Sequence, residues 1–192
     1  MKSFTRLLCI NIVIIALISI WAFVNFNAEY IYRENGFLEN AQVVYLVLAG
    51  IVFFAASIKN GERAPLIPLF FSILCAAFIF RELDFERISD NAIVVAFASG
   101  LGRNIIMALL IAGVLCAALL RFKFYFAESL KWFKSKSGLL FVLFGILVVA
   151  ASVFEEAAKA DIIAHGQFFE EYFETLAYCA LFISGMVQFN AR

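Results

Sequence analysis

The most constraining feature of this 192-residue chain is a series of long apolar runs separated by short polar stretches. A helix needs about 20 mainly apolar residues to cross the roughly 30 Å hydrocarbon layer of a membrane. The runs that approach this length are Leu7–Phe26, Leu38–Ile58, Pro65–Phe80, Asn104–Leu120, Gly138–Phe154 and Tyr172–Phe189. The sequence therefore predicts an all-α, polytopic membrane helix bundle of six transmembrane helices, with residues 1–192 forming a single domain.

Composition supports a membrane environment. The chain is 65% hydrophobic and 16% charged, whereas a soluble domain carries about a quarter charged residues and roughly half apolar ones. Twenty-four phenylalanines and two prolines suit lipid-facing helices better than a soluble core. The formal net charge is zero, so composition indicates no nucleic-acid partner and favours the lipid bilayer as the surrounding medium.

The distribution of lysine and arginine predicts the orientation of the bundle. With the N-terminus in the cytoplasm and six alternating helices, ten cations and two carboxylates lie on the cytoplasmic side, against five cations and thirteen carboxylates outside. Both termini are then cytoplasmic. Leu7–Phe26 follows Lys2 and Arg6 but is too long for a signal peptide, and no small-x-small cleavage site follows it, so we interpret it as an uncleaved anchor. These features suit a bacterial inner membrane, with the acidic loops in the periplasm.

Two segments have more than one interpretation. Asn91–Gly100 is apolar but too short to span a membrane, so it is either a re-entrant or interfacial segment or the start of a longer fourth helix. Arg121–Lys136 mixes cations with aromatic residues. It is either an interfacial helix that binds phospholipid or, more simply, a cationic loop with an aromatic belt.

Ionisable residues gather where the predicted helices end on the outward face. The candidate site residues are Glu39, Gln42, Arg81, Glu82, Asp84, Glu155, His165, Glu171 and Glu174. Glu39 suits the positive end of a helix dipole, but Glu155 closes its helix at the negative end. Glu174 also lies four residues after the like-charged Glu170, which is destabilising unless another group compensates. These residues form either a rim of ion pairs in solvent or a functional pocket.

The residue types limit the chemistry of such a pocket. Carboxylates with amides suit Ca²⁺ or Mg²⁺, whereas zinc favours several histidine or cysteine ligands and this chain has one histidine. His165 is either a general acid or base, oriented by Glu170 or Asp161, or an ordinary surface residue. The cysteines lie in or beside the apolar runs and are expected to pack as small hydrophobic residues. No nucleophile motif is evident.

Two acidic stretches resemble a known pattern. Residues 34–39, with the sequence Glu-Asn-Gly-Phe-Leu-Glu, precede Arg81-Glu82-Leu83-Asp84-Phe85. This order resembles uncharacterised bacterial polytopic membrane proteins, in which an acidic-Gly-x-x-Glu stretch precedes a Glu-Ile-Ser-aromatic stretch. More distantly, Glu39 and Gln42 are similar to part of the pattern of the CREST superfamily of alkaline ceramidases and related membrane hydrolases. That superfamily uses several metal-binding histidines, including an HxxxH pair, so its catalytic roles do not transfer to a chain whose single histidine is His165.

Three function classes follow. The chain is an accessory membrane protein that docks another membrane or periplasmic protein on its acidic face, a metal-dependent enzyme acting on a lipid or envelope substrate at the outer leaflet, or a small transporter. A transporter predicts ionisable groups near mid-membrane, and the centres of the predicted helices contain none. An enzyme predicts that Glu39, Glu82 and either Glu171 or Glu174 converge on one cavity.

Overall fold

The computed structural model describes residues 36–59, 64–83, 99–163 and 166–191, and individually Ile10, Val13 and Leu17. The regular elements in these ranges are α3 (Phe37–Lys59), α4 (Leu66–Glu82), α7 (Gly100–Leu119), α8 (Phe122–Phe133), α9 (Lys136–Lys159) and α10 (Gly166–Asn190). The predicted all-α class is confirmed for this part of the chain. Three helices, α3, α7 and α9, are long and apolar enough to cross a membrane, as expected of a membrane protein.

Five of the predicted runs coincide with these helices, but the boundaries differ. The largest shift is in the last helix, which begins at Gly166 rather than at Tyr172 and therefore includes Glu170 and Glu171. The predicted run Leu7–Phe26 lies outside the described residues apart from the three individual positions.

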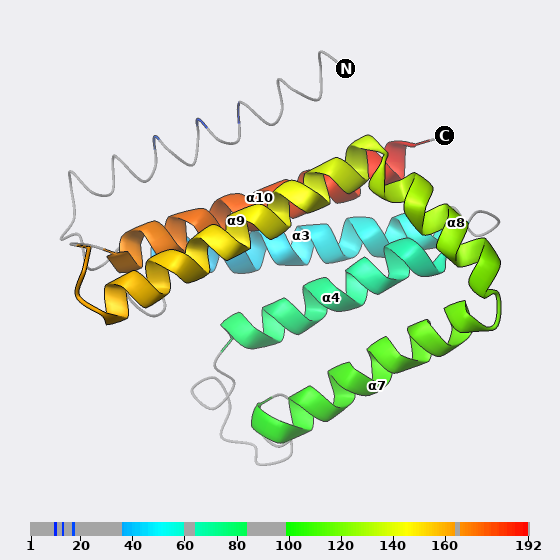
Figure 1. The fold of residues 1–192 in the computed structure, drawn as a ribbon, viewed down its shortest axis with the longest axis horizontal. Helices are drawn as coiled ribbons and strands as arrows, with labels where there is room; N and C mark the ends of the chain where they lie inside the picture. The colour runs from blue at the N-terminus through cyan, green and yellow to red at the C-terminus, as the bar shows by residue number, and fades with distance from the viewer. Residues whose placement is uncertain are drawn as a thin grey trace.

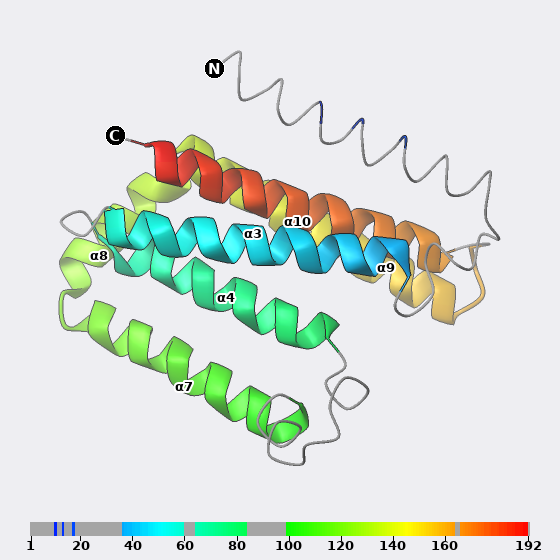
Figure 2. The ribbon, with the colours of Figure 1, turned by 180° about the vertical axis from the view of Figure 1, so that it is seen from behind.

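The helices α3, α4, α9 and α10 pack into the central bundle. Helix α10 lies between α3 and α9, and α3 also contacts α4 (Figures 1 and 2). Successive buried residues of α3, including Leu38, Gln42, Leu46 and Phe53, recur every three to four residues and therefore form one stripe along the helix. This spacing places the polar Gln42 inside the bundle together with its apolar neighbours.

Aromatic side chains fill the core between α4, α9 and α10. The ring of Phe71 on α4 stacks on Trp132 of α8, with centroids 4.5 Å apart, and lies 4.7 Å from the ring of Phe141 on α9. Further along, Phe144 of α9 lies 6.2 Å from Tyr178 of α10. Offset and tilted ring pairs of this kind are favourable in packed interiors.

Helix α7 lies at the edge of the bundle and contacts α4 and α8 (Figure 1). Val114 is its one buried residue. Ser99, just before the helix, is extended with φ −122° and ψ 164°, and Gly100 has φ +52°. Because neither residue has helical angles, α7 does not continue back into Asn91–Gly100 as one longer helix; the remainder of that segment lies outside the described residues.

The helix ends form two chemically different surfaces. The starts of α3, α7 and α10 lie with the ends of α4 and α9, on the left in Figure 1. This acidic end carries eight described carboxylates (Glu39, Glu82, Glu155, Glu156, Asp161, Glu170, Glu171, Glu174) and three cations (Arg81, Arg103, Lys159). Among the described residues, the opposite, basic end carries six cations (Lys59, Arg121, Lys123, Lys131, Lys134, Lys136) and one carboxylate, Glu128.

The cationic segment Arg121–Lys136 contains the helix α8, so it is not the simple loop that one interpretation expected. A tight turn joins α8 to α9. A side chain at Gly138 would place its first carbon 2.2 Å from the carbonyl oxygen of Trp132, so only glycine fits there. The hydroxyl of Ser135 caps α9 by accepting a hydrogen bond from the Gly138 amide at 3.2 Å.

Candidate polar site at the acidic end

A buried amide joins α3 to α10. Gln42 is fully buried, and its Nε2 donates to Oε2 of Glu171 at 2.7 Å and to the Glu171 carbonyl oxygen at 3.2 Å. The Oε1 atom of Gln42 is also buried and accepts no hydrogen bond from the described residues. Leaving a buried acceptor without a donor costs about 1–3 kcal/mol. The amide nitrogen of Gln42 is therefore satisfied, whereas its amide oxygen is not.

The environment of Glu171 favours its protonated form. Glu171 lies before the predicted span Tyr172–Phe189. Burial raises the pKa of Glu171 to about 8, and the neighbouring charge of Glu174 contributes to the rise, whereas the hydrogen bond from Gln42 lowers the pKa. The pKa of Glu170 is also raised, to about 7, first by burial and then by the charge of Glu155. Two carboxyls at the start of α10 therefore titrate near neutral pH.

A second cluster joins α4 to α10 through one guanidinium group. The Nη2 atom of Arg81 lies 2.7 Å from Oε1 of Glu82 and 2.8 Å from Oε1 of Glu174. The same atom donates to the Tyr178 hydroxyl at 2.9 Å, and this hydroxyl donates to Oε1 of Glu82 at 3.0 Å. Charge-assisted bonds of this type are shorter and stronger than neutral ones.

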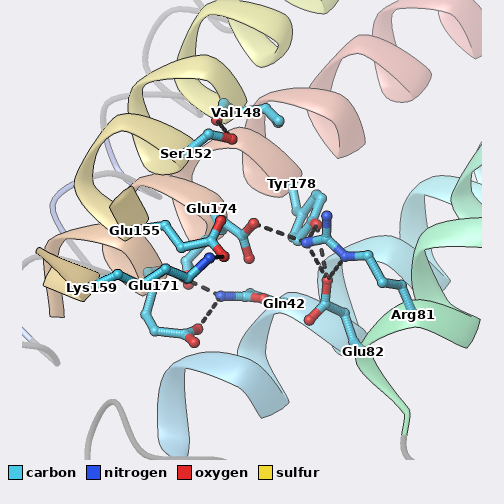
Figure 3. Close-up of polar contacts among 11 residues, drawn as sticks. Gln42, Arg81, Glu82, Val148, Ser152, Glu155, Lys159, Glu171, Glu174 and Tyr178 are labelled. Carbon is cyan, nitrogen blue, oxygen red and sulfur yellow. Dashed lines mark hydrogen bonds and ion pairs between the residues drawn. The ribbon is translucent and has the colours of Figure 1, made fainter. Parts of the chain in front are cut away.

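The helix sequence explains how these groups come together. Glu171, Glu174 and Tyr178 are spaced by three and four residues, so they share one face of α10. Arg81 and Glu82 occupy the last turn of α4, which runs antiparallel to the start of α10 (Figure 1). Figure 3 shows that the Gln42 pair and the Arg81 cluster lie side by side along α10. The repulsion expected between Glu170 and Glu174 is offset because Glu174 is held by Arg81.

Glu155 belongs to a different contact at the end of α9. Its Oε1 lies 2.6 Å from Nζ of Lys159 (Figure 3). Oε1 of Glu156 lies 3.1 Å from the same nitrogen atom. Glu155 and Glu174 are close enough for their charges to interact. Lys159 therefore compensates the unfavourable position of Glu155 at the negative end of the α9 dipole.

The structure brings together five of the predicted site residues, Gln42, Arg81, Glu82, Glu171 and Glu174. Glu39 lies in the first turn of α3, three residues before Gln42 and half-buried. Asp84 and His165 lie outside the described residues. Sequence reasoning missed Tyr178, although its spacing of four residues from Glu174, within an otherwise apolar stretch, was an available signal.

The side chains present define the chemistry that the site can support. The residues described include no group of three or more His, Cys, Asp or Glu side chains arranged to hold a metal ion. The neighbouring groups are instead the titratable carboxyl of Glu171, the Arg81 guanidinium that holds Glu174, and the buried acceptor Oε1 of Gln42. Such a set suits the binding of a hydrogen-bond donor or a cation, and proton exchange near neutral pH.

Comparison with known proteins found no match: neither a protein-family model, nor a curated protein, nor a solved structure is similar to this chain.

Proposed function

We propose that this chain is a six-span inner-membrane protein whose acidic end faces the periplasm and docks a cationic segment of another membrane or periplasmic protein. The observation that carries the proposal is the excess of carboxylates among the described residues of the acidic end, eight against three cations. Two of those cations are already engaged, because Arg81 pairs with Glu82 and Glu174 and Lys159 pairs with Glu155 and Glu156. The surface therefore remains negative after its internal ion pairs are formed.

Exposed carboxylates of the acidic end, among them Glu156 and Asp161, suit a cationic partner. Lysine and arginine side chains are pure hydrogen-bond donors, so they complement these acceptor-only groups. Complementary charge steers association and selects partners more than it adds raw affinity. The proposal thus predicts binding that weakens as the salt concentration rises.

The proposed orientation is supported by the cation asymmetry between the ends, where the described residues include six cations at the basic end and three at the acidic end. Single-cysteine variants on a cysteine-free background test it in intact cells with a membrane-impermeant thiol reagent. Gln167→Cys at the acidic end should react from outside, and Ala127→Cys on α8 should react only after the membrane is opened. The reverse labelling pattern would overturn the orientation.

Docking is tested by photocrosslinking in the native host. A photoreactive residue at Gln167, which is exposed and uncharged, should capture a defined partner protein. The same residue at Ala127 serves as the matched position at the basic end. Neutralising two exposed acids outside the Arg81 cluster, Glu156→Gln with Asp161→Asn, should lower the Gln167 crosslink several-fold. Crosslinking that is insensitive to these charges would contradict a charge-driven docking surface.

An enzyme acting on a lipid or envelope substrate is the second candidate. It is favoured by the convergence of Gln42, Glu171 and the Arg81 cluster from three different helices (Figure 3). For its metal-dependent form, elemental analysis of the purified protein should find stoichiometric Ca²⁺ or Mg²⁺ that is lost in Glu171→Gln and in Glu39→Gln. Metal-free protein would remove this form of the hypothesis.

A further inference from the structure

Helix α8 connects two helices that are long and apolar enough to cross a membrane, α7 and α9. It has 12 residues and is therefore about 18 Å long, too short to cross the hydrocarbon layer itself. In Figure 1 it runs across the basic end rather than along the bundle. If α7 and α9 cross the membrane, α8 therefore lies at the interface between the membrane and water.

One side of α8 is anchored to the bundle. Trp132 is buried, stacks on Phe71 and donates through Nε1 to Oε1 of Gln188 at 2.8 Å. Tyr125 and Ser129, which lie seven and three residues earlier on the same side, are partly buried. These contacts fix the rotation of the helix, so the remaining sides have defined directions.

An apolar stripe lies on the first exposed flank. Phe122, Phe126, Leu130 and Phe133 are between 44% and 57% exposed. Their spacing of three to four residues places them along one line of the helix. The rings of Phe122 and Phe126 stack with centroids 5.5 Å apart. Water is an unfavourable environment for an exposed aromatic stripe of this length, whereas the boundary between headgroups and acyl chains is a favourable one.

A cationic stripe runs beside the apolar one. Lys123 and Lys134 are exposed and eleven residues apart, which is close to three helical turns, so both point to the same side. Lys134 has helical backbone angles, φ −82° and ψ −8°, so the register extends to it. Lys131 is partly neutralised by Glu128 at 2.6 Å, and that carboxylate is the one described acid at this end.

We propose that α8 is a binding surface for anionic phospholipid headgroups in the bilayer that surrounds the bundle. The apolar stripe lies at the acyl boundary, and the lysine stripe contacts headgroup phosphates. The six cations of the basic end complement a negatively charged lipid surface, and the neighbouring aromatic stripe distinguishes this surface from one built for a soluble acidic partner.

The test uses the purified full chain in detergent with added phosphatidylglycerol or phosphatidylcholine, and native mass spectrometry counts the lipids retained. The wild-type chain should retain phosphatidylglycerol preferentially. Each lysine near an anionic surface contributes about fivefold to affinity, so Lys123→Gln with Lys134→Gln should weaken retention by about 10- to 30-fold. The charge-preserving pair Lys123→Arg with Lys134→Arg should keep it.

Two controls complete the test. Lys159→Gln removes a cation from the acidic end and should leave the lipid preference unchanged. Raising the salt concentration to about 0.5 M should reduce the preference of the wild-type chain for phosphatidylglycerol. This control does not depend on whether any variant folds. The proposal is overturned if the wild-type chain shows no preference for phosphatidylglycerol, if the glutamine pair retains the full preference, or if Lys159→Gln lowers it equally.

Discussion

The two ends of the bundle use charge in opposite ways. At the acidic end, polar side chains turn inward: Gln42 is fully buried, and the side chains of Glu82 and Glu174 are 11% and 15% exposed around Arg81. At the basic end the described lysines are exposed, and the inward contacts come from uncharged side chains, including Trp132 and the hydrogen-bonded pair Ser137 and Ser184. Buried charge is expensive to maintain, so its confinement to one end, among the described residues, marks that end as the place to seek a specific binding function.

The largest difference between the ends is expected from removing Trp132, because apolar packing holds the basic end. Trp132→Ala deletes a buried ring that stacks on Phe71 and should cost about 4 kcal/mol of unfolding free energy. Trp132→Phe keeps most of the packing and loses the bond to Gln188, at a cost of about 1 kcal/mol. Chemical unfolding in detergent, followed by circular dichroism, measures both. Equal costs for the two variants would show that the hydrogen bond, not the ring packing, holds α8.

The corresponding change at the acidic end is Arg81→Ala. It leaves Glu82 and Glu174 without their shared cation, and we expect a loss of about 2–3 kcal/mol in the same unfolding assay. This loss lies at or below the low end of the roughly 3–5 kcal/mol expected for a buried ion pair, because the Arg81 side chain is 47% exposed. Adding Glu174→Gln to Arg81→Ala should restore part of the loss. A double variant no more stable than Arg81→Ala would contradict direct coupling between the two residues.

Much of the helix pattern could be predicted because it depends on local composition. The run Leu38–Ile58 became α3 with a change of one residue at each end. The start of α10 at Gly166 was missed because Glu170 and Glu171 interrupt the apolar pattern on which the prediction rested. Arg121–Lys136 was ambiguous because a short helix with cations on its exposed side has too few apolar residues to resemble a span.

The sequence predicted which residues belong to the candidate site but not which of them contact one another. The anomalous placement of Glu174 four residues after Glu170 did indicate that a partner was required. That partner, Arg81, lies 93 residues away in the sequence. Only the arrangement of the bundle, in which α4 and α10 both pack on α3, selects it from several available cations. Tyr178 was missed because a tyrosine within an apolar run resembles ordinary core packing, and its role depends on the same helix register.

Measuring stability against pH sharpens the comparison between the two ends. Carboxyl groups that titrate near neutral pH, Glu170 and Glu171, lie at the acidic end. The folded-state pKa of Glu171, about 8, lies above the ordinary value of 4.5, so its protonated form stabilises the fold. This contribution is complete below about pH 4.5 and is lost as the pH rises through 8. The charged neighbours involved are Glu174, Glu170 and Glu82. Stability should therefore fall by about 1–2 kcal/mol between pH 6 and pH 9.

Glu171→Gln is the control for this pH dependence. A glutamine cannot ionise, so the variant should lose most of the decline between pH 7 and pH 9 in the unfolding free energy. The part of the decline nearer pH 6 belongs also to Glu170, whose pKa of about 7 gives a change of the same sign. An unchanged decline in Glu171→Gln would assign the titration to another group.

The smallest effect on stability is expected from Lys159→Gln. This variant tests whether Lys159 is coupled to the cluster around Arg81. Lys159 is a 60% exposed side chain that pairs with two carboxylates at the surface, Glu155 and Glu156. Solvent screens such pairs, so the unfolding midpoint in detergent should not change measurably. Glu155 is nevertheless close enough to Glu174 for their charges to interact. A loss as large as that of Arg81→Ala would therefore show that Lys159 and Glu155 belong to the same coupled network as Arg81, and that the inward-turned charge of the acidic end extends across α9 as well as α4 and α10.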